Sequence, residues 1–168
     1  MSDTGLVMVE VLERTTHWIT NAEEILADEK VADIAPILEP MFRNGSAMRL
    51  ADFDPLDYAA LAPDMCLMDV GGSPTRFFFR LIGTRIIDLY GIDNTGKYLD
   101  ELKDEIGDFY GPVVEAFDCT VTTQNFVRQS TTFEWVDRKY VKSESIQIPL
   151  ISDTGDTVRL VTFSQITC

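Results

Sequence analysis

Hydrophobic and polar positions follow two different periods along the chain, and the change comes at Met65. Before it, residues 21–45 carry apolar side chains at helical spacing, with Asn21 placed to cap one helix and Asp33 to cap a second. The apolar run Leu6–Leu12 does not decide between helix and strand. We therefore expect residues 1–47 to form a helical N-terminal extension.

From Met65 onward the apolar positions recur with the two-residue period of strands. Met65–Val70 and Arg76–Ile82 predict two strands joined by a turn. A helix then follows, capped by Thr84 and ended at Gly91, and a longer helix is expected over residues 112–122. Three more strands are expected at Thr131–Val136, Val141–Ile151 and Thr157–Ile166, the last two forming a hairpin.

Alternation along the second strand, RFFFRLI, indicates that both of its faces are largely apolar. One face would carry Phe77, Phe79 and Leu81, and the other Phe78, Arg80 and Ile82. A strand with two apolar faces needs cover on both sides. We expect the crossover helices on one side and the N-terminal helices on the other.

The stretch Gly91–Tyr98, GIDNTGKY, is close to the phosphate loop of nucleoside-triphosphate enzymes. That loop ends in Lys followed by Ser or Thr, because the hydroxyl holds magnesium, and it lies between a strand and a helix. Here Tyr98 replaces the hydroxyl residue, and the stretch follows a predicted helix. A nucleotide triphosphate is therefore disfavoured, and a turn between two short helices is expected.

Charge narrows the choice of partners, since 28 acidic residues face 14 basic ones and leave a formal net charge of −14. Such a field disfavours nucleic acid and anionic membrane surfaces. No secretory signal and no apolar run of membrane-spanning length is present, so we expect a cytoplasmic protein. The 45% hydrophobic content is that of a chain with a folded core.

Few residues suggest catalysis or metal binding. His17 is the single histidine, which excludes a histidine pair and most relay triads. Cys66, Cys119 and Cys168 are widely spaced, as expected for reduced thiols. The acidic run from Asp100 to Asp108 lacks the spacing of a calcium loop and is expected to be a solvated helix face. We expect no catalytic residue and no metal site.

The element order and several local motifs together resemble the PAS domains of bacterial signalling proteins. FFFRLIGTRIIDLYGIDNTGKYLDEL is similar to the PAS stretch in which a strand ends at Gly, a short helix reaches another Gly, and a Gly-Lys pair opens the next helix. DFDP at 52–55 and IPLISDTGDTV at 148–158 are similar to segments of compact stand-alone bacterial PAS proteins. The resemblance covers residues 48–166.

The resemblance implies an α+β fold with a five-stranded antiparallel sheet of order 2-1-5-4-3 over residues 48–168, the sensory domain. The cofactor is unknown. Haem held through His is disfavoured, because the longer helix has none, and a flavin–Cys adduct is disfavoured, because no Asn-Cys-Arg-like motif follows the second strand.

In a PAS arrangement, the apolar side chains of these elements would converge on the inner face of the sheet and line a ligand pocket. That predicted pocket consists of Phe77, Phe79, Leu81, Ile86, Tyr90, Phe109, Val113, Phe117, Phe133, Trp135 and Phe163. The alternative is that these side chains fill an ordinary core. A homodimer is expected through Ile34, Ile37, Leu38 and Met41 of the extension.

The sequence thus favours a non-enzymatic PAS-type sensory or regulatory domain. It would bind a small apolar or amphipathic ligand and signal to a partner protein in trans. Two alternatives stay open: a ligand-free interaction protein of the same fold, and an enzyme in which Arg80, Tyr90 and an acid such as Asp137 share a polar cleft.

Overall fold

The computed structural model describes residues 8–18, 32, 34–42, 47–107, 110–125, 127–135 and 138–167. Its strands are β1 Met8–Trp18, β2 Met48–Arg49, β3 Met65–Gly71, β4 Arg76–Ile82, β5 Val127–Trp135, β6 Arg138–Ile151 and β7 Thr157–Thr167. Its α-helices are α2 Ala35–Phe42, α3 Thr84–Tyr90, α4 Lys103–Ile106 and α5 Tyr110–Thr123. Three 3₁₀ helices complete the set, η2 Leu50–Asp52, η3 Pro55–Asp64 and η4 Leu99–Leu102.

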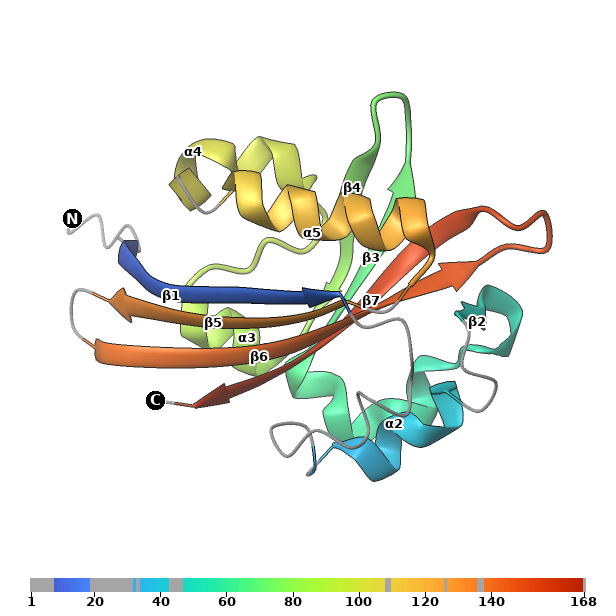
Figure 1. The fold of residues 1–168 in the computed structure, drawn as a ribbon, viewed down its shortest axis with the longest axis horizontal. Coiled ribbons are helices and arrows are strands. Elements are labelled where there is room, and N and C mark those ends of the chain that lie inside the picture. The colour runs from blue at the N-terminus through green and yellow to red at the C-terminus, as the bar shows by residue number, and fades with distance from the viewer. Residues whose placement is uncertain are drawn as a thin grey trace.

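The strands form one sheet in the order β1-β5-β6-β7-β3-β4, with β2 pairing with β6 beside this path (Figure 1). All neighbours along the path are antiparallel, and β2 is parallel to β6. Renumbered by the predicted strands, β4-β3-β7-β6-β5 is the order 2-1-5-4-3. The predicted α+β fold and strand order are therefore confirmed.

The N-terminal strand β1 is the main difference from the prediction. A helical extension over residues 1–47 is wrong for Met8–Trp18, which pairs with β5 along its length. The physical reason is that β5 offers an open edge, and the β-branched residues of MVEVLERTTHW favour a strand when such a partner exists. His17, expected on a helix, lies opposite Arg128 in this pairing.

The rest of the extension is only partly described. Residues 35–42 form the expected helix α2, with Pro36 in its first turn. The helix predicted from Asn21 lies outside the described residues. The division into an extension and a domain beginning at residue 48 remains a prediction.

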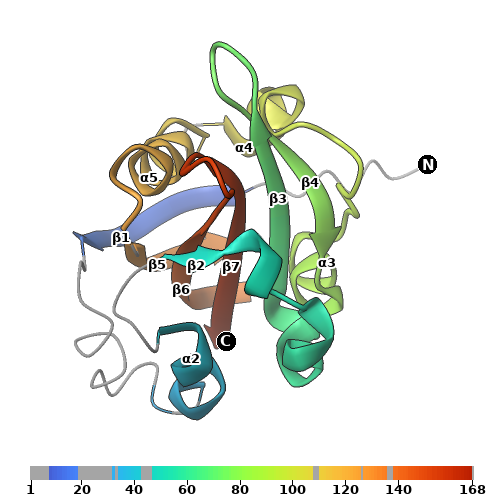
Figure 2. The ribbon, with the colours of Figure 1, turned by 90° about the vertical axis from the view of Figure 1, so that its right-hand side faces the viewer.

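Each face of the sheet carries its own hydrophobic cluster, and helices cover the two faces from opposite sides (Figure 2). On one side, α5 and η4 cover a cluster of Met68, Phe77, Leu99, Phe117 and Leu160. On the other side, α2 and η3 cover a larger cluster that includes Leu38, Met41, Tyr58, Leu61, Leu67, Ile148, Val161 and Phe163. We name these the α5 face and the α2 face. Helices thus cover both faces of the sheet, but the cover expected on both faces of β4 is incomplete, since Phe77 is its only buried residue and Arg80 is exposed.

A β-bulge in β4 changes the expected faces of that strand. Leu67 lies opposite Leu81, but the next residue, Met68, lies opposite Phe79, so Arg80 is the extra residue. An extra residue reverses the alternation beyond it. Leu81 therefore packs in the cluster of the α2 face, not with Phe77 and Phe79 as predicted.

The predicted dimer seam is used inside the chain. Leu38 and Met41 of α2 are 0% and 3% exposed and pack against the sheet, and Ile34 and Ile37 contact the same cluster. The physical reason is that the α2 face is apolar and needs cover. Leu38 and Met41 therefore cannot form a dimer seam while α2 stays in place, and for the half-buried Ile34 and Ile37 the seam stays a prediction. The homodimer itself remains a prediction.

The stretch Gly91–Tyr98 forms the expected turn between two short helices. Gly91 ends α3 in the left-handed conformation with φ of 76°. Lys97 Nζ donates to the side-chain oxygen of Asn94 at 3.1 Å. The backbone then pairs with β4, where Phe79 N donates to Lys97 O at 2.9 Å. The loop thus covers the edge strand of the sheet.

Gly83 joins three elements by a very close backbone approach. It ends β4 and caps α3, where Thr84 was predicted as the cap, and its N–H donates to Met65 O at 2.8 Å. A Cβ built on Gly83 would overlap the carbonyl oxygens of Ala62 and Pro63 at the end of η3. The φ of Gly83 is −63°, which any residue can adopt. Glycine is therefore required here for the close approach of the two backbones and not for its backbone conformation.

We expect Gly83→Ala to destabilise the protein by about 3 kcal/mol, because the overlap is with backbone atoms that cannot rotate away. The measurement is urea unfolding followed by circular dichroism. Gly111→Ala is the matched control, because a Cβ there meets nothing within 4 Å. It should be neutral or stabilise by up to about 1 kcal/mol. Equal stability of the two variants would contradict the proposed constraint.

Candidate functional site

A row of polar side chains crosses the α5 face beside its hydrophobic cluster. Across neighbouring strands, the pairing aligns Gln147 of β6, Thr162 of β7 and Cys66 of β3. These residues are 1%, 7% and 7% exposed, and Gln129 of β5 is 6% exposed two residues from this row. Such polar groups on a buried sheet face need hydrogen-bond partners.

Gln147 is held from above by α5. Thr120, 0% exposed, places its hydroxyl 2.9 Å from Ala116 O and 3.0 Å from Gln147 Oε1. The hydroxyl carries one proton, so Ala116 O and Gln147 Oε1 compete for it. The side-chain amide of Gln147 is therefore a polar group held under α5 in nearly complete burial.

Thr162 and Cys66 continue the row. The Thr162 hydroxyl hydrogen-bonds the Cys66 thiol, but burial dominates and raises the pKa of Cys66 to about 12. Such a thiol is a poor nucleophile at neutral pH, because the thiolate is the reactive form. Although 37% of Tyr90 on α3 is exposed, its phenol group is enclosed, which together with Cys66 raises its pKa to about 12.

The apolar half of the α5 face is closely packed. Phe77 and Phe117 meet edge to face with ring centroids 5.3 Å apart. Met68, Leu99 and Leu160 beside them are at most 2% exposed. This half therefore has the character of a core, and the polar row marks the half of the face where a ligand could be recognised.

The structure brings together part of the predicted pocket. Phe77, Phe79, Val113 and Phe117 meet in the cluster of the α5 face. Leu81 and Phe163 belong to the α2 face instead, since the bulge and the alternation of β7 place them there. Ile86 is buried on α3. Phe109 lies outside the described residues, as do the side chains of Phe133 and Trp135.

Sequence reasoning missed Thr120, Gln147 and Thr162, because it looked for rings. A signal was present in the sequence IQIPL, where alternation puts Gln147 opposite in face to two isoleucines. A polar residue on an apolar strand inside the sheet implies a partner on the covering helix.

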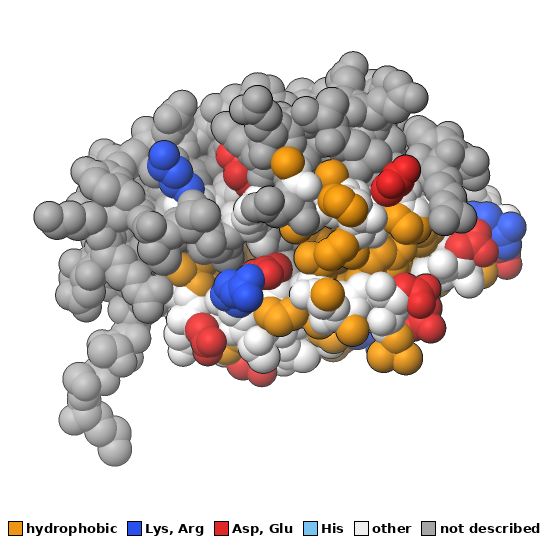
Figure 3. Space-filling view, turned by 90° about the horizontal axis from the view of Figure 1, so that it is seen from below, with side chains coloured by type: hydrophobic (Ala, Val, Ile, Leu, Met, Phe, Trp, Pro, Cys, Tyr) orange, Lys and Arg blue, Asp and Glu red, His pale blue; other side chains and the backbone are white. Residues whose placement is uncertain are grey.

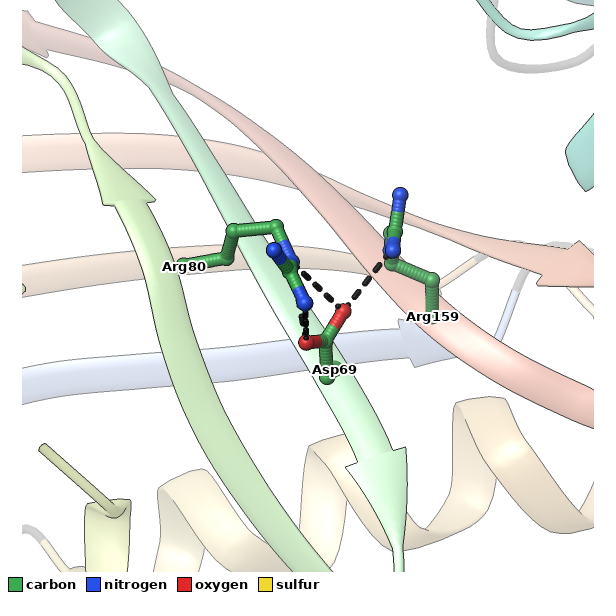
Figure 4. Close-up of polar contacts among 3 residues, drawn as sticks. All are labelled: Asp69, Arg80 and Arg159. Atoms are coloured by element: carbon green, nitrogen blue, oxygen red, sulfur yellow. Dashed lines mark hydrogen bonds and ion pairs between the residues drawn. The ribbon is translucent and has the colours of Figure 1, made fainter. Parts of the chain in front are cut away.

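A charged cluster lies on the α2 face, at the end away from α2. Asp69 of β3 lies between two arginines (Figure 4). Arg80 of β4 donates from Nε and Nη2 to both carboxylate oxygens, and Arg159 of β7 donates from Nε to Oδ1 at 2.8 Å. The Arg80 hydrogen bonds are the main reason that the pKa of Asp69 is lowered. The bulge places Arg80 for this contact.

The polar cleft of the enzyme alternative stays a prediction, because Asp137 lies outside the described residues. Of its other expected members, Arg80 is engaged by Asp69. The acidic run from Asp100 is solvent-exposed where described, with Asp100 paired to Arg76 at 2.6 Å. Within the described ranges, no group of three His, Cys, Asp or Glu side chains could hold a metal ion. None of the described helices is long and apolar enough to cross a membrane.

Comparison with solved structures gives the class of this fold. An RNA-binding light-oxygen-voltage receptor superposes with a TM-score of 0.52 at 13% identity, over 95% of this chain and 39% of the receptor. A PAS domain from Colwellia psychrerythraea gives 0.45 at 17% identity, over 68% and 98% of the two chains. A sensory box histidine kinase/response regulator from Burkholderia thailandensis E264 gives 0.39 at 14% identity, over 68% and 85%.

No protein-family model and no curated protein matches the sequence. The chain spans 39% of the length of the light-oxygen-voltage receptor that it matches. The strand order of this chain and its superposition on the receptor identify the fold: this chain has the PAS fold.

We expect Asp69→Asn to destabilise the protein by about 1–2 kcal/mol at neutral pH, because two arginines lose a shared carboxylate. The lowered pKa means that this contribution is present above the unfolded pKa of about 3.9 and is lost as the pH falls through the folded pKa. The measurement is urea unfolding of wild type and variant at a series of pH values.

Asp153→Asn is the matched control, because its ion pair with Arg49 has side chains 82% and 62% exposed. It should change stability by less than about 0.5 kcal/mol. A difference between wild type and Asp69→Asn that stays constant into the acid range would contradict the assigned role of the carboxylate.

Proposed function

We propose that this chain is a PAS-type sensory or regulatory domain of the cytoplasm. In this proposal it has no catalytic role of its own and binds a small amphipathic ligand beneath α5. Binding changes how α5 and its neighbours sit on the sheet, and a partner protein in trans detects that change.

The observation that carries the proposal is the state of Gln147. Its side chain is 1% exposed, and the single proton of the Thr120 hydroxyl is shared between its oxygen, at 3.0 Å, and Ala116 O. Small-molecule sites combine an apolar lining with a few oriented polar groups of this kind. A ligand carbonyl or carboxylate would accept from the amide nitrogen of Gln147, and its apolar part would contact the Phe77–Phe117 cluster.

Charge supports a protein partner over a nucleic acid. The light-oxygen-voltage receptor that shares this fold is described as RNA-binding, but a formal net charge of −14 repels phosphate backbones. The matched part of that receptor is also less than half of its length. We therefore extend only the sensory class to this chain.

A ligand-free interaction protein is the second candidate. The close ring packing of Phe77 and Phe117, and the burial of Leu160 beside them, favour it, since a filled core needs no ligand. The two candidates differ in whether the polar row holds a molecule.

Native mass spectrometry of the protein purified from its own cells separates them. We expect a retained small molecule, released on denaturation, that adds a constant mass to the protein. The double variant Thr120→Val and Gln147→Leu should lose at least about 90% of it, because a charge-assisted or neutral hydrogen bond contributes a tenfold or larger factor in affinity.

Thr154→Ala is the matched control, since Thr154 lies in the exposed β6–β7 hairpin, where it bonds Asp156 at 3.1 Å. It should retain the molecule fully. Bare protein in repeated preparations would favour the interaction protein. A molecule retained equally by the double variant would place the binding site elsewhere.

A further inference from the structure

A hollow lies on the α2 face of the sheet. It has a volume of about 210 Å³ and is bounded by η3, α3, the end of β7 and the residue just before α2. Its apolar wall consists of Ile34, Leu61 and Phe163. On this side of the molecule hydrophobic side chains gather between charged ones (Figure 3).

The charged wall of this hollow is an ion pair whose two side chains can make further hydrogen bonds. Arg85 Nη1 donates to Asp64 Oδ2. Asp64 Oδ1 is enclosed and finds no hydrogen-bond partner within the described ranges. Within the same described residues, Nη1 is the one nitrogen of Arg85 that donates a hydrogen bond. One carboxylate oxygen and further guanidinium donors thus lie side by side.

The two charged groups differ in depth. The Asp64 side chain is 15% exposed, and that of Arg85 is 60% exposed. Asp64 therefore marks the inner end of the polar wall and Arg85 the solvent side. Together they are electrically neutral, so a neutral ligand leaves no net charge in the hollow.

We propose that this hollow binds a small zwitterion of the α-amino acid class with an apolar side chain. The ammonium group donates to Asp64 Oδ1, and the carboxylate accepts from the remaining N–H groups of Arg85. The side chain packs against Leu61 and Phe163. This site is separate from the polar row of the α5 face and does not depend on the function proposed for it.

Simpler ligands fit the charged wall less well. A carboxylate without an amine would leave Asp64 Oδ1 without a donor and bring a second negative charge toward it. An amine without a carboxylate would bring an uncompensated positive charge close to Arg85. The volume of about 210 Å³ suits a ligand smaller than drug-sized molecules, whose pockets have volumes of about 300–1,000 Å³.

A ligand in the hollow would contact several elements of the fold at once. Ile34 precedes α2, whereas Asp64 ends η3 and Phe163 lies in β7, so the ligand would contact segments far apart in the sequence. Binding should slow the local opening of α2, because the ligand would contact Ile34, the residue just before that helix.

The test is an NMR titration of the full chain with three probes: L-leucine, 4-methylpentanoate, which lacks the ammonium, and 3-methylbutylamine, which lacks the carboxylate. We expect saturable shifts with L-leucine at the amides of Leu61, Phe163 and Gln165. Each truncated probe should bind about tenfold more weakly or less, as expected for the loss of one charge-assisted hydrogen bond. Hydrogen exchange of α2 should slow with L-leucine alone.

Asp64→Asn and Arg85→Gln should each weaken the binding of L-leucine by about tenfold or more. Arg85→Gln is the safer variant for folding, because this side chain is the more exposed of the pair. Asp153→Asn is the matched control and should bind as wild type does. The proposal is overturned by an absence of saturable shifts, by shifts confined to the α5 face, or by equal binding of the three probes. It is also overturned if Arg85→Gln folds and binds L-leucine unchanged.

Discussion

The close approach of Gly83 to the end of η3 is the constraint on which much of the architecture depends. At this point the chain leaves β4 and enters α3, and only a residue without a side chain lets the backbone pass the carbonyls of Ala62 and Pro63. The Gly83 N–H bonds Met65 O at 2.8 Å, which closes the start of β3 against the end of β4. Asp64 and Arg85 flank this contact in the sequence. The backbone contact thus brings Asp64 and Arg85 close enough to form their ion pair.

The sheet then separates two surfaces of different chemistry. The α5 face has an apolar half and a row of buried amide and hydroxyl groups, whereas the α2 face has a larger apolar cluster with charged groups at its margins. A single residue, Arg80, takes part in this division, because its bulge moves Leu81 to the α2 face and brings its own guanidinium to Asp69. Bulges of this kind re-aim side chains where a regular strand could not.

How far the sequence predicts this structure depends on whether a feature is local. The β3–β4 hairpin, α3 and the β6–β7 hairpin follow from periodicity and turn residues, and the strand order followed from the resemblance to PAS domains. Strand β1 could not be predicted, because residues 8–18 form a strand by pairing with β5, which lies more than a hundred positions later in the sequence. The face on which Leu81 lies was predicted wrongly for another reason. The alternation of apolar and polar residues does not show where a strand has a bulge. The rings were predictable as core, but the polar row was not, since its meaning depends on Thr120 lying above Gln147.

The strand β7 connects the two candidate sites, because Thr162 and Phe163 are consecutive and point to opposite faces. A shift of this strand by one residue would exchange its two faces, and its pairing with both β6 and β3 prevents that. The sheet is therefore a fixed partition, and a ligand on either face can alter only what covers that face. In the function proposed above, a change caused by a ligand would pass through α5 on one side or through α2 and η3 on the other, where contacts are side-chain packing and not strand ladders. Covering helices open locally at lower free energy than central strands, so in that proposal they are the elements that would change when a ligand binds.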